Sequence, residues 1–219
     1  MTTTRVVRDE VNNLLDYLLG AEIAVFSNVV SITETRVTWH ALNPTAPFLV
    51  NRGDPSLDDY KHWVEAGAYS ALLFDGSLLQ ITYDVEGGKI VGHRLAYIPC
   101  PYRLDPTMVK TDPILDIIDL HVDTEPTSMV LHSWVRFDFD PEAAGPSHPA
   151  AHMTINGMDC RIACAAPLHL GRFADFVFRH FYPEIWRAHL SYFTAGARRE
   201  IGERTITEED KNSPHLHWN

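Results

Sequence analysis

The sequence predicts an α+β fold: a single domain with one curved, mainly antiparallel sheet, against which N-terminal and C-terminal helices pack. Apolar, alternating segments joined by tight-turn residues lie between residues 70 and 98, and this pattern indicates a three-stranded meander. Helical periodicity marks the beginning of the chain and the stretch after residue 170. Strand and helix patterns do not alternate regularly, which disfavours a parallel, doubly wound sheet.

The first part of the chain is expected to contain two helices with strands between them. Apolar residues at three- and four-residue steps over residues 4–19 predict the first helix. Residues 21–33 are rich in Ile, Val and Phe and predict a strand with one break, and residues 35–40 pair with it. A short edge strand is expected at residues 48–50. A serine cap followed by two aspartates predicts the second helix over residues 56–66.

The meander is the clearest local signal in the chain. Its strands are expected at residues 70–74, 78–85 and 89–98. Asp75-Gly76 joins the first two and Glu86-Gly87-Gly88 joins the last two, and both are typical hairpin turns. These strands therefore form the centre of the predicted sheet.

The second half of the chain is expected to add further strands and helices to this centre. In order, we expect a helix over residues 113–121, strands over residues 127–140, 152–156 and 160–164, and helices over residues 170–182 and 184–196, separated by Pro183. The domain is then expected to span residues 1–197. Residues 198–219 are charged and polar, and we expect a flexible C-terminal tail there.

Composition limits the classes of function. The chain has 219 residues and a formal net charge of −11, which argues against a broad, sequence-independent grip on nucleic acid. Nucleic-acid binding through a small local groove stays open. The three cysteines include no Cys-x-x-Cys pair, and no signal peptide or membrane-spanning segment is visible. We therefore expect a cytoplasmic protein without membrane association.

The stretch from Trp134 to Cys164 carries the candidate site. Side chains alternate between the two faces of a strand, so the phenylalanines at 137 and 139 point to the core. Arg136, Asp138 and Asp140 then share the opposite face, and His152 and His148 can join them from the next strand and its loop. The candidate catalytic residues are Arg136, Asp138, Asp140, His148 and His152, and the candidate substrate-binding residues are His93, Arg94 and Arg161.

These residue types fit more than one kind of site. Two carboxylates and two imidazoles are ligands for a divalent metal, although no metal site is assigned and no cofactor is identified. An imidazole with an arginine could instead cleave a phosphodiester without metal. A purely structural alternative pairs Arg136 with an aspartate on an exposed face and satisfies His152 with a backbone carbonyl. A polar-face position also implies that His152→Ala leaves the fold intact.

Five phrases of the sequence are distinctive in combination: Leu-Phe-Asp-Gly-Ser-Leu at 73–78, His-Arg-Leu-Ala-Tyr-Ile-Pro-Cys-Pro at 93–101, Arg-Phe-Asp-Phe-Asp-Pro at 136–141, His-Pro-Ala-Ala-His at 148–152 and Phe-Tyr-Pro at 181–183. Together they resemble an uncharacterised bacterial family, DUF2290, over residues 14–186. The resemblance implies a bacterial protein found among mobile or defence-associated genes, with no known reaction. The Arg-x-Asp-x-Asp and His-Pro-x-x-His phrases also look like small toxin-type domains that act on RNA.

Two hypotheses of different classes follow. In the first, the chain is a component of a bacterial defence or toxin-like conflict system and acts through a protein partner from the same operon. In the second, it is a small phosphodiesterase or ribonuclease-type effector that uses the Arg/Asp/His face. The net charge favours the first hypothesis, and the clustered site residues favour the second. An open pocket around His152 would favour catalysis.

Overall fold

The computed structural model describes residues 3–40, 55–130, 132–157, 159–197 and 203–218. Within this part, ten strands form one open sheet and seven α-helices surround it, so the α+β prediction is confirmed. The predicted edge strand at residues 48–50 lies outside the described residues. The strands are β1 (Ala24–Ser27), β2 (Val30–Thr33), β3 (Arg36–Trp39), β4 (Ala71–Leu73), β5 (Leu78–Glu86), β6 (Lys89–Ile98), β7 (Val135–Phe139), β8 (Ala151–Ile155), β9 (Arg161–Cys164) and β10 (His215–Leu216).

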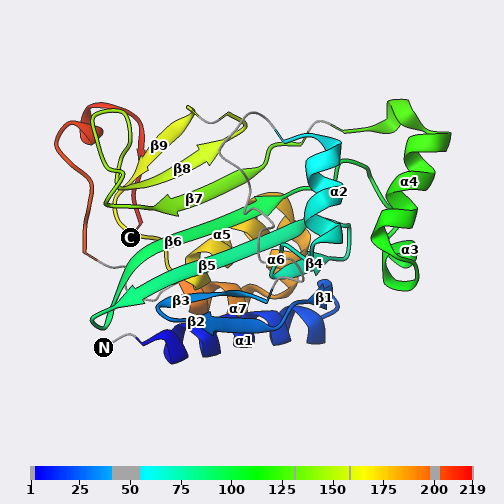
Figure 1. The fold of residues 1–219 in the computed structure, drawn as a ribbon, viewed down its shortest axis with the longest axis horizontal. Helices are drawn as coiled ribbons and strands as arrows, with labels where there is room; N and C mark the ends of the chain where they lie inside the picture. Colours follow the sequence, from blue (N-terminus) through cyan, green and yellow to red (C-terminus); the bar gives the residue numbers. More distant parts are fainter. Residues whose placement is uncertain (1–2, 41–54, 131, 158, 198–202, 219) are drawn as a thin grey trace.

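The sheet is antiparallel except at one edge. Its order is β1-β4-β5-β6-β7-β8-β9-β10, and the β2–β3 hairpin joins through pairing of β3 with β5 (Figure 1). The predicted meander is present as β4, β5 and β6. At the far edge β10 pairs with β9 in parallel, so the segment predicted to be a tail contributes a strand. In the same segment Trp218 packs against the core, with its ring centroid 6.1 Å from that of Phe137.

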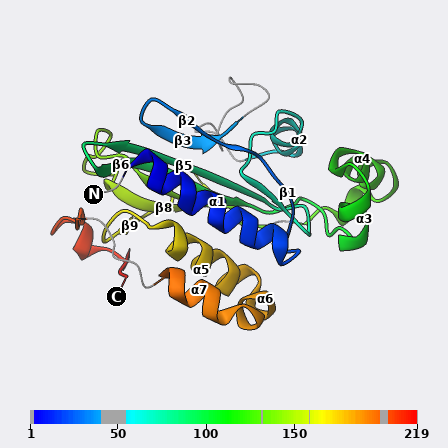
Figure 2. The same cartoon turned by 90° about the horizontal axis from the view of Figure 1, so that it is seen from below.

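The helices lie on both faces of the sheet. They are α1 (Thr4–Gly20), α2 (Leu57–Glu65), α3 (Pro106–Thr111), α4 (Ile114–Thr124), α5 (Leu170–Phe181), α6 (Pro183–Ala188) and α7 (Leu190–Ala197). Figure 2 shows α1, α5 and α7 on one side of the sheet and α2 on the other. Ser56 caps α2 through a reciprocal capping box with Asp59, as the sequence predicts for this helix start.

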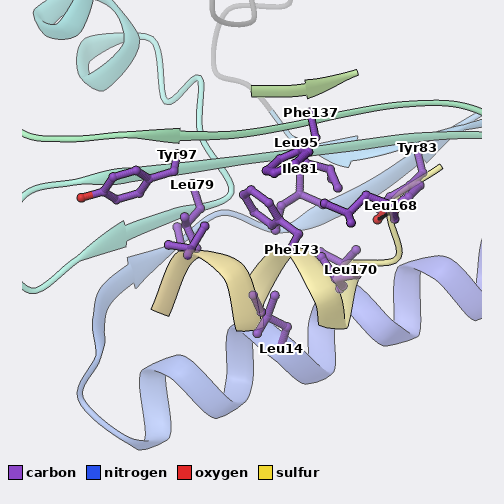
Figure 3. Close-up of a cluster of buried hydrophobic side chains, with 14 of the residues drawn as sticks. Leu14, Leu79, Ile81, Tyr83, Leu95, Tyr97, Phe137, Leu168, Leu170 and Phe173 are labelled. Atoms are coloured by element: carbon purple, nitrogen blue, oxygen red, sulfur yellow. Dashed lines mark hydrogen bonds between the residues drawn. The ribbon is translucent and has the colours of Figure 1, made fainter. Parts of the chain in front are cut away.

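Two apolar cores result from this layering. The larger core lies between the sheet and α1, α5 and α7, where Phe173 and Leu170 of α5 meet Leu95 and Phe137 of the central strands (Figure 3). The smaller core lies on the opposite face under α2, around Trp63. Burial of each large apolar side chain stabilises the fold by about 1.5–3 kcal/mol. The two cores leave part of the second sheet face to polar side chains.

Some predicted elements differ from the structure. The strand predicted over residues 127–140 is only β7, because its partner β6 ends before Pro99, and proline cannot donate to the ladder. The helix predicted over residues 184–196 is divided at His189, whose ring is hydrogen-bonded to the Tyr17 hydroxyl of α1 at 2.7 Å. Helix α3 was not predicted, although Asp105 as its cap and Pro106 at its first position signal it.

Candidate functional site

Three neighbouring strands bring candidate residues to one face of the sheet. Cross-strand pairing sets Arg94 of β6 opposite Asp138 of β7, and Asp138 opposite His152 of β8. Directly opposite residues in an antiparallel pair project from the same face. Phe137 and Phe139 point to the larger core. The predicted common face of Asp138 and His152 is therefore confirmed, and Arg94 joins it from β6.

Asp138 is the centre of the cluster. Its Oδ2 lies 2.6 Å from Nε of Arg136, and its Oδ1 lies 3.4 Å from Nε of Arg94. Nε2 of His152 lies 3.4 Å from Oδ2. Burial favours the neutral carboxyl, but the interaction with His152 and the charges of Arg136 and Arg94 outweigh burial, so the pKa of Asp138 is lowered. Asp138 is therefore a buried counter-ion for the guanidinium groups of Arg136 and Arg94.

His152 is held between the sheet and the loop that precedes β8. Its Nδ1 donates to the carbonyl oxygen of Pro149 at 2.8 Å, and this bond directs Nε2 toward Asp138. The ring of His148 lies against it, with 4.7 Å between the centroids. Nδ1 of His148 in turn donates to the Ala143 carbonyl at 2.7 Å. The loop thus places the ring of His148 against His152, whose Nε2 faces Asp138.

The interior of the cluster is closed to solvent, which corrects the expectation of an exposed strand face. The residues of its interior are almost fully buried: Arg136 3%, Asp138 4%, His152 1% and Thr154 0% exposed. Within the described part of the chain, Nε2 of His152 and Oγ1 of Thr154 have no hydrogen-bond partner. The ion pair of Arg136 and the carbonyl bond of His152 agree with the structural alternative, but they occur in the interior.

Three other candidate residues do not join the cluster. His93 points to the opposite face, where its Nε2 accepts a hydrogen bond from the Leu168 backbone N–H at 2.8 Å and burial lowers its pKa to about 4. Asp140 ends β7 and accepts from the backbone N–H of Ala143 at 3.2 Å. Arg161 of β9 lies opposite Thr154, with Nη1 3.5 Å from Asp159. Of the predicted substrate-binding residues, only Arg94 contacts Asp138.

Arg94 opens onto a hollow on the same face of the sheet. We call it the polar groove; it has a volume of about 1130 Å³. Its lining residues are predominantly polar: Ser31, Thr33, Thr35, Arg36, Thr38, Trp39, His40, Thr82, Asp84, Glu86, Val91, Gly92, His93, Arg94, Phe139, Asp140, Pro141 and Glu142. Figure 1 shows the strands that form it, β2, β3, β5, β6 and β7, running side by side. His148 and His152 do not line it.

A second buried polar cluster was not predicted as a unit. The hydroxyl of Tyr182 donates to Asp75 at 2.8 Å and lies 3.1 Å from the hydroxyl of Tyr97. Burial raises the pKa of Tyr97 to about 12, and it raises the pKa of the nearby Cys100 thiol to about 12 as well. The phrases at 73–78, 93–101 and 181–183 supply these residues, and their joint occurrence was the available signal. Cys100 is thus a poor nucleophile.

The other cysteines divide between surface and interior. Cys164 is buried, and burial raises the pKa of its thiol to about 12. Cys160 lies just before β9 and is exposed. Among the residues that the structure describes, no group of three or more His, Cys, Asp or Glu side chains could hold a metal ion. No described helix has the length and apolarity needed to span a membrane.

Comparisons with known proteins identify the family alone. Searches of curated proteins and of solved structures find no match. One family model, described as an uncharacterized conserved protein, matches residues 22–218 and so includes β1 to β10 and the cluster around Asp138. This confirms the predicted family resemblance and extends it to the C-terminal strand. The chain belongs to the DUF2290 family of uncharacterized conserved proteins.

Proposed function

We propose that this chain is a binding component that acts through a protein partner, and that the partner docks in the polar groove. The bacterial defence or toxin-like setting implied by the family resemblance is part of the same proposal. The observation that carries it is the contrast between a closed cluster and an open groove. His152 is 1% exposed, whereas the groove beside it is large and lined by hydroxyls and charges.

The rim of the groove indicates the chemistry of the partner. Glu86 and Glu142 are exposed, and neither makes an ion pair with any described residue. The guanidinium of Arg36 is already neutralised by Asp84, to which it donates two hydrogen bonds of 2.8 and 2.9 Å. The rim therefore presents uncompensated negative charge, in agreement with the net charge of −11. A segment with basic side chains is the complementary partner.

The phosphodiesterase hypothesis remains a second candidate because of one observation. His148 contacts His152, and His152 lies beside a carboxylate that pairs with two guanidinium groups. Acid–base cleavage of a phosphodiester uses these types of group. A substrate would reach His152 only if the loop over residues 141–150 moved away. Binding needs no such movement, which is why we favour it.

The test compares three forms of the full chain as bait in a lysate of its host. They are the parent, the groove variant Glu86→Lys/Glu142→Lys, and the control variant Glu65→Lys/Asp123→Lys at exposed helix positions. Each double variant changes the net charge from −11 to −7, since every acid-to-lysine change adds two units. A partner captured by the parent is identified and purified, and its affinity for all three forms is measured.

We expect the groove variant to bind the partner at least about tenfold more weakly and the control variant to bind it like the parent. Equal binding by the groove variant overturns the proposal. RNA cleavage by the purified parent that is lost in His148→Ala would also overturn it, and would support the phosphodiesterase instead. His148 is partly exposed in a loop, so this variant should stay folded.

A further inference from the structure

Arg94 differs from the other guanidinium group of the polar groove. Its Nε end points to Asp138 at 3.4 Å, and 40% of its side chain is exposed. Its terminal Nη groups make no hydrogen bond or ion pair with the described residues, and the side chain lines the groove. Arg36, by contrast, directs its fork at Asp84. In the groove, therefore, the guanidinium of Arg36 is already paired with a carboxylate, whereas the terminal nitrogens of Arg94 are available to a ligand.

The buried carboxylate of Asp138 fixes the position of Arg94 from the interior side of the groove. Asp138 is buried and cannot move to cover the outer end of Arg94, because it is also bonded to Arg136 at 2.6 Å. Gly92, two residues before Arg94 on the same strand face, also lines the groove and contributes no side chain to it. The guanidinium is therefore preorganised, with its free edge turned to the groove.

From this geometry, and resting on the proposed function, we infer that Arg94 is an anion-binding residue that takes a carboxylate from an acidic side chain of the docked partner. A guanidinium offers parallel N–H donors that match a carboxylate in a two-bond arrangement. A phosphate offers similar oxygens. The carboxylates at Glu86, Asp140 and Glu142 around the floor repel a phosphate backbone, whereas a peptide with mixed charges satisfies both floor and rim.

The test observes the arginine Nε–Hε signals of the full chain by NMR while acetate replaces chloride at constant ionic strength. The signal of Arg94 is assigned by its loss in Arg94→Lys. Arg36, whose guanidinium is already paired with Asp84, serves as the control in the same groove. Arg187, an exposed residue of α6 with no ion pair to the described residues, serves as the surface control.

We expect a saturable shift at Arg94, with an apparent affinity at least about tenfold above that at Arg187, and no saturable shift at Arg36. A linear response at Arg94 like that of Arg187 overturns the inference. Inorganic phosphate is titrated in parallel. If phosphate binds at Arg94 more than about tenfold more tightly than acetate, the assignment to a carboxylate is overturned in favour of a phosphate-bearing ligand.

This measurement uses the isolated chain, whereas the rim-charge experiment uses the partner. If acetate does not bind at Arg94 but Glu86→Lys/Glu142→Lys still weakens partner binding, the anion site is ruled out and the docking groove stands. Acetate binding at Arg94 without any effect of the rim variant removes the docking proposal, and the inference about the partner's carboxylate with it. The two failures are therefore distinguishable.

Discussion

Asp138 and His152 lie directly opposite each other on β7 and β8, with 3.4 Å between Oδ2 and Nε2, and at least 95% of each side chain is shielded from solvent. A carboxylate in the interior is stable only where it is paired and hydrogen-bonded. Arg136, Arg94 and His152 supply that pairing here. The cluster is therefore part of the folded interior, and its residues affect stability before they affect any activity.

His152→Ala should destabilise the protein by about 2–4 kcal/mol. The change removes a fully buried ring, leaves the Pro149 carbonyl without its donor and takes one partner from Asp138. This reverses the expectation from strand alternation alone, under which the ring faced solvent. Urea denaturation followed by circular dichroism measures the difference. His132→Ala, at an exposed position before β7, is the control. A difference below about 0.5 kcal/mol between the two variants would place His152 outside the stabilising network.

The sequence predicted which residues share a face, because alternation has a period of two and Pro141 limits the end of β7. It did not predict that this face is buried. Alternation assigns polar side chains to the side away from one core, and here a second core under α2 and the loop carrying His148 lie on that side. Helix α2 is distant in sequence from Asp138. The loop carrying His148 follows β7 directly, but alternation along the strand does not predict how that loop packs.

The site was predictable in part for a related reason. Asp138 and His152 lie on strands that are consecutive in the sequence, so their proximity could be predicted from alternation along those two strands. The polar groove needs the β2–β3 hairpin beside β5, a contact between residues about 48 positions apart such as Arg36 and Asp84. A single sequence gives no signal for that pairing. Arg94 was named as a candidate, but its open edge depends on the groove.

His93 should make the stability of the protein fall between pH 6.5 and pH 4. Burial lowers its pKa from 6.5 to about 4, so the unfolded chain binds the proton in this range and the folded chain does not. Stability from this residue is complete above pH 6.5, falls as the pH drops and levels off below pH 4, with a total loss of about 3 kcal/mol. Urea unfolding at several pH values measures it.

The matched variant for this pH effect is His93→Gln, which keeps an acceptor for the Leu168 N–H but does not titrate. We expect it to be less stable at pH 7 and to lack the decline between pH 6.5 and pH 4. The lowered pKa of Asp138 acts in a separate window, because its contribution is lost only as the pH falls below about 4. An unchanged slope in His93→Gln would assign the decline to other groups.

Phe137→Ala should cost about 3–5 kcal/mol, because the ring is 1% exposed and meets Phe173 and Phe176 of α5 edge-on. Phe26→Ala removes the same atoms from a ring that is 48% exposed, so we expect a loss of less than about 1 kcal/mol. Thermal unfolding and urea unfolding of both variants measure the contrast. Similar losses in the two variants would be incompatible with the burial of the β7 face that carries Phe137.

Gly171→Ala tests the contact between α5 and α7. A Cβ at Gly171 would lie 2.3 Å from the backbone oxygen of Gly196, and backbone cannot rotate away as a side chain can. The helices would have to separate and open the core around Phe193, at a cost of about 1–3 kcal/mol. Gly20→Ala is the matched control, since nothing lies within 4 Å of its added Cβ and alanine favours the helix. We expect Gly20→Ala to keep or raise the melting temperature and Gly171→Ala to lower it. Equal melting temperatures would mean that α5 and α7 are not in close contact at Gly171 and Gly196.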